Sequence, residues 1–290
     1  MQRTNKMTYI FLIPTIIVFL VLTVYPLLYV ITASFFSMNY LQGTEWKFVG
    51  FQGYQELFQD SLFWVAFKNT IIFVVIAVSL EVFFGLMFAI LFQKNFKGSA
   101  IIRSIVLLPM LLPPITVALT WKMMYEYDYG IINYFLTLVG LPAIEWLSSA
   151  DWALFSIVIT DVWQWTPFAF LIILASLQTI PKDLYESAAV NGASGFQAFR
   201  YITLPLLKPV ILLVLFLRTI DTFQIFDKMY VLTGGGPGNA TETLTFYIYR
   251  QGFRYFETGY ATAATLVVVI IIVILSIGYI KSVYKSAYSR

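Results

Sequence analysis

Six long apolar segments alternate with polar segments along the chain, and this pattern predicts the architecture. A helix needs about 20 apolar residues to cross the hydrocarbon core of a bilayer, and each segment is long enough to do so. We therefore predict transmembrane helices near residues 9–32, 70–92, 101–123, 152–176, 206–229 and 260–281. The first segment exceeds the apolar core of a signal peptide, about 7–15 residues, so we expect it to be retained.

Composition supports this pattern, because 60% of the residues are hydrophobic and only 11% are charged. Soluble proteins carry about 25% charged residues. We expect an all-α polytopic membrane protein with a single transmembrane domain over residues 1–290. The third apolar segment contains Pro109, Pro113 and Pro114, so its helix should be kinked.

The chain contains neither Cys nor His. Disulfides, thiol chemistry and histidine-ligated metal sites are therefore excluded, and we expect no metal site. The most common catalytic side chains are also missing, which argues against a membrane-embedded enzyme. A net charge of +3 gives no indication of a nucleic-acid partner.

Positive charge is concentrated on one side of the predicted membrane. That side holds both termini and carries eleven cations with only two acids, Asp183 and Glu186. The opposite loops carry six cations and ten acids. By the positive-inside rule both termini are cytoplasmic, and an even number of spans requires the same arrangement. The eleven cations are Arg3, Lys6, Lys94, Lys97, Arg103, Lys182, Arg200, Lys208, Lys281, Lys285 and Arg290.

Residues 177–205 form the long polar interruption between the fourth and fifth predicted spans. Pro181 suits the first turn of a short helix, and Asn191-Gly192 favours a left-handed stop after it. From spacing alone, an amphipathic helix lying on the membrane is an equally good interpretation of this first helix.

A second short helix is predicted in the same loop. Ser194 and Gln197 have the spacing of a capping box, which opens a helix. Pro205 is expected to end this helix before the next apolar segment begins.

The loop contains Glu186-Ser187-Ala188, then Gly192, and later Ile202-Thr203-Leu204-Pro205. This arrangement resembles the EAA motif of binding-protein-dependent ABC importer permeases. Ser187 stands where that motif usually has Ala, and Asn191 stands where Asp commonly precedes Gly. The resemblance implies coupling helices that sit in a cleft of a separate ATPase subunit. The residues it implies for this coupling are Tyr185, Glu186, Ser187, Ala188, Ala189, Asn191, Gly192 and Pro205.

A glycine-rich segment, residues 233–241, follows the fifth predicted span. It is not a phosphate-binding loop, because the Lys-Ser/Thr ending is absent and the segment is predicted to be external. With Glu242-Thr243 it resembles a loop of the carbohydrate-type permeases related to maltose and glycerol-phosphate importers. The likeness also includes residues 51–57 and Leu108-Pro109 and covers most of the chain. The glycines alone would favour a flexible turn.

The resemblance implies an inner-membrane permease subunit that imports a sugar or oligosaccharide by alternating access. It also implies a second homologous permease subunit, two ABC ATPase subunits and an extracytoplasmic solute-binding protein as partners, besides sugar and membrane lipid. The chain itself is not expected to be an enzyme or to bind a cofactor, because ATP and Mg²⁺ belong to the ATPase subunits.

Ionisable side chains inside the predicted spans indicate a second functional region. Placing one such side chain in the bilayer at a helix centre costs at least about 2.5 kcal/mol of free energy. At 1.5 Å per residue, Asp161 and Asp221 both lie about 14 Å from the external surface. Carboxylates and amides bind sugar hydroxyls, and aromatic rings pack on sugar C–H groups. The six predicted substrate-pathway residues are Asp161, Gln164, Trp165 and Phe168 on one helical face and Asp221 and Gln224 on another. Lys228 shares the second face but is not one of the predicted pathway residues.

Two alternatives remain open for these charges. Arg218 and Asp221 are i, i+3 neighbours and can form a purely structural ion pair, and a structural role is favoured for Glu81. A different class of protein, an ion-coupled secondary transporter, would use Glu81, Asp161 and Asp221 as ion sites.

Overall fold

The computed structural model describes residues 6–39, 43, 45–94 and 96–288, and most of this chain is helical. Arg3 and Arg290, which support the predicted orientation, lie outside these residues. The α-helices are α1 (Lys6–Phe19), α2 (Tyr25–Ala33), α3 (Gln52–Gln59), α4 (Ser61–Phe92), α5 (Ser99–Leu111), α6 (Pro114–Met124), α7 (Ile131–Leu138), α8 (Ala150–Gln178), α9 (Lys182–Val190), α10 (Gly195–Ala198), α11 (Leu204–Phe223), α12 (Asp227–Leu232), α13 (Leu244–Tyr249) and α14 (Thr258–Tyr288). The π-helical turns are η1 (Leu20–Val24), η2 (Phe199–Thr203) and η3 (Arg250–Arg254). A single antiparallel hairpin pairs β1 (Phe36–Ser37) with β2 (Lys47–Phe48) in the described part, so the all-α prediction is confirmed.

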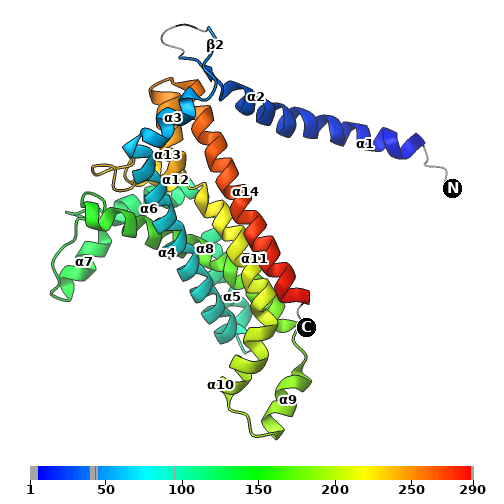
Figure 1. The fold of residues 1–290 in the computed structure, drawn as a ribbon. Coiled ribbons are helices and arrows are strands. Elements are labelled where there is room, and N and C mark those ends of the chain that lie inside the picture. Colours follow the sequence, from blue (N-terminus) through cyan, green and yellow to red (C-terminus); the bar gives the residue numbers. More distant parts are fainter. Residues whose placement is uncertain (1–5, 40–42, 44, 95, 289–290) are drawn as a thin grey trace. The chain divides into compact units, whose positions relative to one another are not determined.

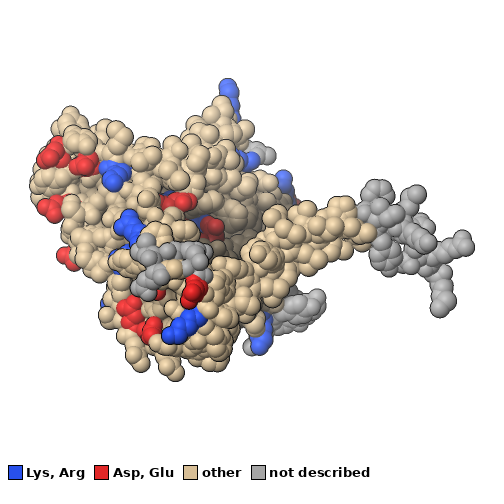
Figure 2. Space-filling view, turned by 90° about the horizontal axis from the view of Figure 1, so that it is seen from above, with Lys and Arg blue, Asp and Glu red and all other residues tan. Residues whose placement is uncertain are grey.

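Five helices of the described chain are long and apolar enough to cross a membrane, and a bent helix pair makes a sixth candidate. Each of the six predicted segments overlaps one of these candidates. The five are Leu12–Ala33, Ser61–Phe92, Ala150–Gln178, Gly195–Phe223 and Thr258–Lys281, and the bent pair is Ser99–Leu111 with Pro114–Met124. Figure 2 shows one face, on which Lys, Arg, Asp and Glu occupy scattered positions among other residues.

The chain divides into two compact units. The first comprises Met1–Trp64 and Tyr247–Ile271, and the second comprises Val65–Phe246 and Ile272–Arg290. The second unit contains both regions that the sequence singled out, namely the charges within spans and the 177–205 loop.

The third span is broken rather than merely kinked. Helix α5 ends at Leu111, Leu112 adopts an extended conformation, and α6 begins at Pro114 after a bend of 96°. Pro113 and Pro114 cannot donate backbone hydrogen bonds, so a continuous helix cannot form across them. The break leaves the carbonyl of Leu112 without a helical partner inside the apolar region.

The fifth span ends earlier than predicted, and the predicted end at residue 229 is wrong. Helix α11 ends at Phe223, and the short helix α12 starts at Asp227. The predicted helical face that joined Asp221, Gln224 and Lys228 therefore does not exist, and the depth estimated for Asp221 does not apply. The apolar pattern continues past Phe223, because α12 is also packed in the core through Met229 and Leu232.

The prediction that Pro205 ends the second helix of the 177–205 loop is also wrong. Helix α10 continues through η2 into α11, and residues 195–223 form one continuous helical segment. Pro205 lies in the first turn of α11, directly after the wider π-helical turn. A π-turn changes the hydrogen-bond register, so the missing N–H of a proline is accommodated there.

The two short helices of the 177–205 loop form as their local signals predict (Figure 1). Ser194 and Gln197 make the reciprocal capping-box bonds at the start of α10. Gly192 has a φ of +77°, so the left-handed stop after α9 is confirmed. This conformation favours glycine over any residue with a side chain.

The core of the second unit is built by α4, α6, α8 and α12 around buried aromatic and aliphatic side chains. Gly85 of α4 sits against α8, where an added Cβ would lie 2.6 Å from the Cβ of Ala169. The helices can approach this closely only because position 85 has no side chain. The buried cluster consists of Phe73, Ala77, Ala118, Tyr125, Trp146, Ile157, Val158, Met229 and Leu232.

The glycine-rich loop after α12 is packed rather than flexible. Thr241, Glu242 and Thr243 are completely buried, and Asn69 of α4 donates hydrogen bonds to the carbonyls of Asn239 and Glu242, each at 3.0 Å. The interpretation as a flexible turn is therefore wrong for this segment.

Candidate functional site

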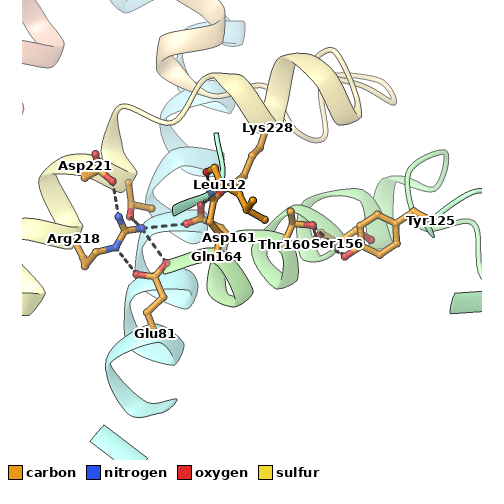
Figure 3. Close-up of polar contacts among 11 residues, drawn as sticks. Glu81, Leu112, Tyr125, Ser156, Thr160, Asp161, Gln164, Arg218, Asp221 and Lys228 are labelled. Carbon is orange, nitrogen blue, oxygen red and sulfur yellow. Dashed lines mark hydrogen bonds and ion pairs between the residues drawn. The ribbon is translucent and has the colours of Figure 1, made fainter. Parts of the chain in front are cut away.

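Arg218 of α11 is the centre of a buried ionic network in the second unit (Figure 3). Its Nε lies 2.7 Å from Oε2 of Glu81, and its Nη2 lies 3.0 Å from Oε1 of the same carboxylate. Such a bidentate geometry is the strongest arrangement of an Arg–carboxylate pair. Both side chains are almost completely buried, and the pair joins α4 to α11.

Asp161 of α8 connects this pair to a second cation. Its Oδ2 lies 3.5 Å from Nη2 of Arg218, and its Oδ1 accepts a hydrogen bond from the ammonium group of Lys228. Asp161 and Lys228 are each 2% exposed. The short helix α12 thus returns a cation to the level of Asp161, which explains why a lysine is tolerated at this depth.

Asp221 and Trp165 complete the surroundings of Arg218. Oδ2 of Asp221 lies 2.5 Å from Nη1 of Arg218, so the i, i+3 ion pair anticipated from the sequence is present. The indole ring of Trp165 covers the guanidinium group, with the ring centroid 4.7 Å from Cζ. Unlike the other members of the network, Asp221 has a side chain that is 61% exposed.

The network opens on a cavity of about 290 Å³. Asp161 and Trp165 contribute to its wall from α8, and Arg218 and Asp221 contribute from α11. Gln224, Asp227 and Lys228 come from the segment after the end of α11, and Pro114 comes from the break in the third span. A site beside a broken helix is a recurrent arrangement in transport proteins, because only there can irregular backbone meet a polar ligand within the membrane.

Four of the six predicted pathway residues line this cavity, namely Asp161, Trp165, Asp221 and Gln224. Phe168 does not line it and instead packs edge-on against Trp165, with ring centroids 6.5 Å apart. Asp227 also lines the cavity and was not among the predictions. The only signal for it was its place in the acidic and amide-rich stretch that follows Asp221.

Gln164 serves the broken third span rather than the cavity. It is completely buried, and its Nε2 donates a hydrogen bond to the carbonyl of Leu112 at 2.9 Å. This bond replaces the helical partner that the carbonyl lost at Pro113-Pro114. The helical face predicted from sequence is therefore divided between two tasks.

Replacing Gln164 by Ala is expected to reduce stability. The part-buried carbonyl of Leu112 would lose its donor, which costs about 1–3 kcal/mol. Thermal unfolding of the detergent-solubilised protein should shift to lower temperature for this variant. Gln178→Ala, an exposed position at the end of the same helix, is the control and should leave the transition unchanged. Equal transitions for both variants would contradict this role of Gln164.

The first unit contains a separate polar pocket of about 450 Å³ near Glu56, Asp60 and Glu257. Oδ2 of Asp60 accepts hydrogen bonds from the hydroxyls of Tyr247 at 2.5 Å and Tyr260 at 3.4 Å. Burial raises the pKa of Tyr247, and the hydrogen bond to Asp60 raises it further, so this phenol remains a donor at neutral pH. The bonds position Asp60 within its own unit.

No group of three or more carboxylates is arranged to hold a metal ion in the part of the chain that the structure describes.

Comparisons with known proteins identify relatives over most of the chain. A family model described as "Binding-protein-dependent transport system inner membrane component" matches residues 81–282. The trehalose/maltose transport system permease protein MalF of Thermococcus litoralis is 39% identical over 282 residues, which cover 96% of this chain and 94% of that protein. The lactose transport system permease protein LacF of Rhizobium radiobacter is 33% identical over 274 residues, covering 92% and 91% of the two chains.

A solved structure is similar along nearly the whole fold. It is a chain of a bacterial alginate ABC transporter in complex with an alginate pentasaccharide-bound periplasmic protein. The TM-score is 0.83 at 26% sequence identity, and the match covers 94% of this chain and 92% of that chain.

Proposed function

Because this chain belongs to the family of inner membrane components of binding-protein-dependent transport systems, we propose that it is the permease subunit through which an ABC importer passes a sugar or oligosaccharide. The observation that carries the choice of cargo is the 39% identity to a trehalose/maltose permease over almost the whole chain. Membership of this family also decides against the alternative of an ion-coupled secondary transporter.

The protein is a multi-pass membrane protein, and we propose that residues 1–290 act as a single transmembrane domain with both termini in the cytoplasm.

The cavity beside Arg218 is the proposed substrate pathway. Its carboxylates and the amide of Gln224 are suited to binding hydroxyl groups, and Trp165 offers a flat apolar surface for a sugar ring. A volume of about 290 Å³ is at the lower limit of ligand sites. The remainder of an oligosaccharide would lie outside it, against the second permease subunit.

The 177–205 loop is the proposed contact with the ATPase subunits. Its two short helices and the following turn η2 expose large apolar side chains, including Val190 at 88%, Phe196 at 74% and Tyr201 at 77%. Exposed apolar groups at this density favour burial in a partner protein. The proposed coupling residues are those of the EAA-like motif, namely Tyr185, Glu186, Ser187, Ala188, Ala189, Asn191, Gly192 and Pro205.

In the proposed assembly, the chain pairs with a second permease subunit, two ABC ATPase subunits and an extracytoplasmic solute-binding protein. ATP and Mg²⁺ bind to the ATPase subunits, which move the 177–205 loop when they close. The permease pair then alternates between a cavity open to the solute-binding protein and a cavity open to the cytoplasm. Coupling requires that nucleotide and the loaded binding protein favour the same conformation.

The proposal is tested by sugar uptake into proteoliposomes that contain the purified complex and its binding protein. Asp221→Ala is expected to reduce ATP-driven uptake by about tenfold, since a charged hydrogen bond contributes about 1.5–3 kcal/mol. The complex should still assemble, because Arg218 retains its contacts with Glu81 and Asp161. Asp161→Ala is less informative, because it leaves Lys228 buried without its counter-ion.

Asp128→Ala, at an exposed position of the same unit, is the control for Asp221→Ala. It should leave both uptake and assembly unchanged. Uptake that does not depend on ATP in the wild-type complex would contradict the proposed function. Normal uptake by Asp221→Ala would contradict the placement of the pathway.

A further inference from the structure

We propose that this cavity selects sugars that carry no negative charge, and that the exposed carboxylate of Asp221 is the specificity-determining group. This inference rests on the proposed function and adds the charge class of the cargo. It concerns the same cavity of about 290 Å³ in the second unit.

Both cations of the cavity wall are already engaged by protein carboxylates. The nitrogens of Arg218 contact Glu81, Asp161 and Asp221, and its Nη2 also lies 3.0 Å from the hydroxyl of Thr222. The indole of Trp165 covers the guanidinium group. A cation that is enclosed in this way cannot form the bidentate contact that a ligand carboxylate requires.

Lys228 is also unavailable to a ligand. Its ammonium group binds Oδ1 of Asp161, and the side chain is only 3% exposed. A carboxylate that entered the cavity would have to displace Asp161 from both of its cations. That exchange would leave the carboxylate of Asp161 buried and unpaired, which is strongly unfavourable.

Carboxylates outnumber cations around the cavity. Asp161, Asp221 and Asp227 line it and Glu81 lies behind Arg218, against two cations, Arg218 and Lys228. Among the described residues, no cation lies within ion-pair distance of Asp227, and Asp221 presents an exposed carboxylate. The accessible groups are therefore hydrogen-bond acceptors of negative charge, which attract sugar hydroxyls and repel uronates or sulfonates.

The fold by itself does not determine the charge of the cargo. The alginate importer shares this fold, and its cargo is an acidic polysaccharide. The discrimination must therefore come from side chains, and among the acids that contact Arg218, Asp221 is the exposed one whose removal leaves the buried pairs intact.

The test uses the purified importer complex with its partners. ATP-driven uptake of trehalose, maltose and lactose into proteoliposomes is measured first. A neutral sugar that is taken up is then chosen for the binding experiment. Binding of this sugar and of its uronic acid form, in which the C6 hydroxymethyl group is oxidised, is then followed by tryptophan fluorescence. Trp165→Phe identifies the part of the signal that comes from the cavity, because Trp165 lines it.

The neutral sugar is expected to bind about tenfold more tightly than its uronic acid form, because the added carboxylate is repelled at short range by the carboxylate of Asp221. Asp221→Asn, which keeps the side-chain shape, should reduce this ratio about fivefold or more, since the repelling charge is gone. Asp128→Asn, an exposed acid elsewhere in the unit, should leave the ratio unchanged.

Equal binding of the two sugars by the wild-type complex would overturn the inference while leaving the proposed function intact. An unchanged ratio in Asp221→Asn would overturn the role of Asp221. If ATP-driven uptake occurs but no signal depends on Trp165, the cavity is not the cargo site and the inference fails. If none of the sugars, nor any other carbohydrate, is taken up with ATP, the proposed function itself fails.

Discussion

Replacing Arg218 by Met is expected to prevent accumulation of folded protein, with a loss of about 3–5 kcal/mol in stability. Methionine fills a similar length of apolar space but removes the positive charge. The carboxylates of Glu81 and Asp161 would then remain buried, Glu81 without its counter-ion and Asp161 with Lys228 alone. The measurement is the amount of monodisperse protein after detergent extraction, together with its thermal unfolding midpoint.

A double variant separates lost charge pairing from lost packing. Glu81→Gln with Arg218→Met removes both charges of the bidentate pair and should recover much of the folded protein that Arg218→Met loses. Arg254→Met, at an exposed arginine, is the control and should behave like the wild type. Wild-type yield and stability for Arg218→Met alone would show that the network is not required for folding.

Replacing Gly192 by Val is expected to uncouple ATP hydrolysis from transport. Gly192 has a φ of +77°, which a β-branched residue adopts only with strain of about 1–3 kcal/mol. The turn between α9 and α10 would change shape, although an added Cβ meets nothing within 4 Å. Because allosteric coupling energies are about 1–3 kcal/mol, distortion of this turn should reduce sugar uptake by about tenfold or more. Stimulation of ATP hydrolysis by the loaded binding protein should fall with it.

Gly195→Val is the matched control for this experiment. Gly195 lies in the same loop, does not have a positive φ and has no atom within 4 Å of an added Cβ. It should therefore retain more of both uptake and stimulated ATP hydrolysis than Gly192→Val. Wild-type uptake and stimulation in Gly192→Val would refute the coupling role of this turn.

The apolar spans and the local signals of the 177–205 loop could be predicted from sequence because they depend on short-range physics. Hydrophobic length determines whether a helix can cross a bilayer, and the capping box of Ser194 and Gln197 involves only neighbours in the chain. The end of the fifth span could not be predicted in the same way. The apolar pattern runs past Phe223, although α11 ends at that residue. After this end, α12 brings Lys228 to Asp161 of α8, a contact between residues far apart in the sequence.

The candidate site was predicted in part for a similar reason. Sequence identifies polar residues within spans, so Asp161 and Asp221 could be found. It does not show which polar group each one meets, and Gln164 was assigned to the cavity although its partner is the carbonyl of Leu112. That partner exists only because the third span breaks at Pro113-Pro114, 50 residues earlier in the chain.

The continuity of residues 195–223 has a mechanical consequence. Twenty-nine helical residues at 1.5 Å each make a rod about 43 Å long, with α10 of the 177–205 loop at one end and Arg218 close to the other. Near that second end, Arg218 binds Glu81 on α4 and Asp161 on α8, so the rod is anchored there. A lateral force on the first end would therefore rotate the helix about this anchor, with the ionic cluster as the pivot.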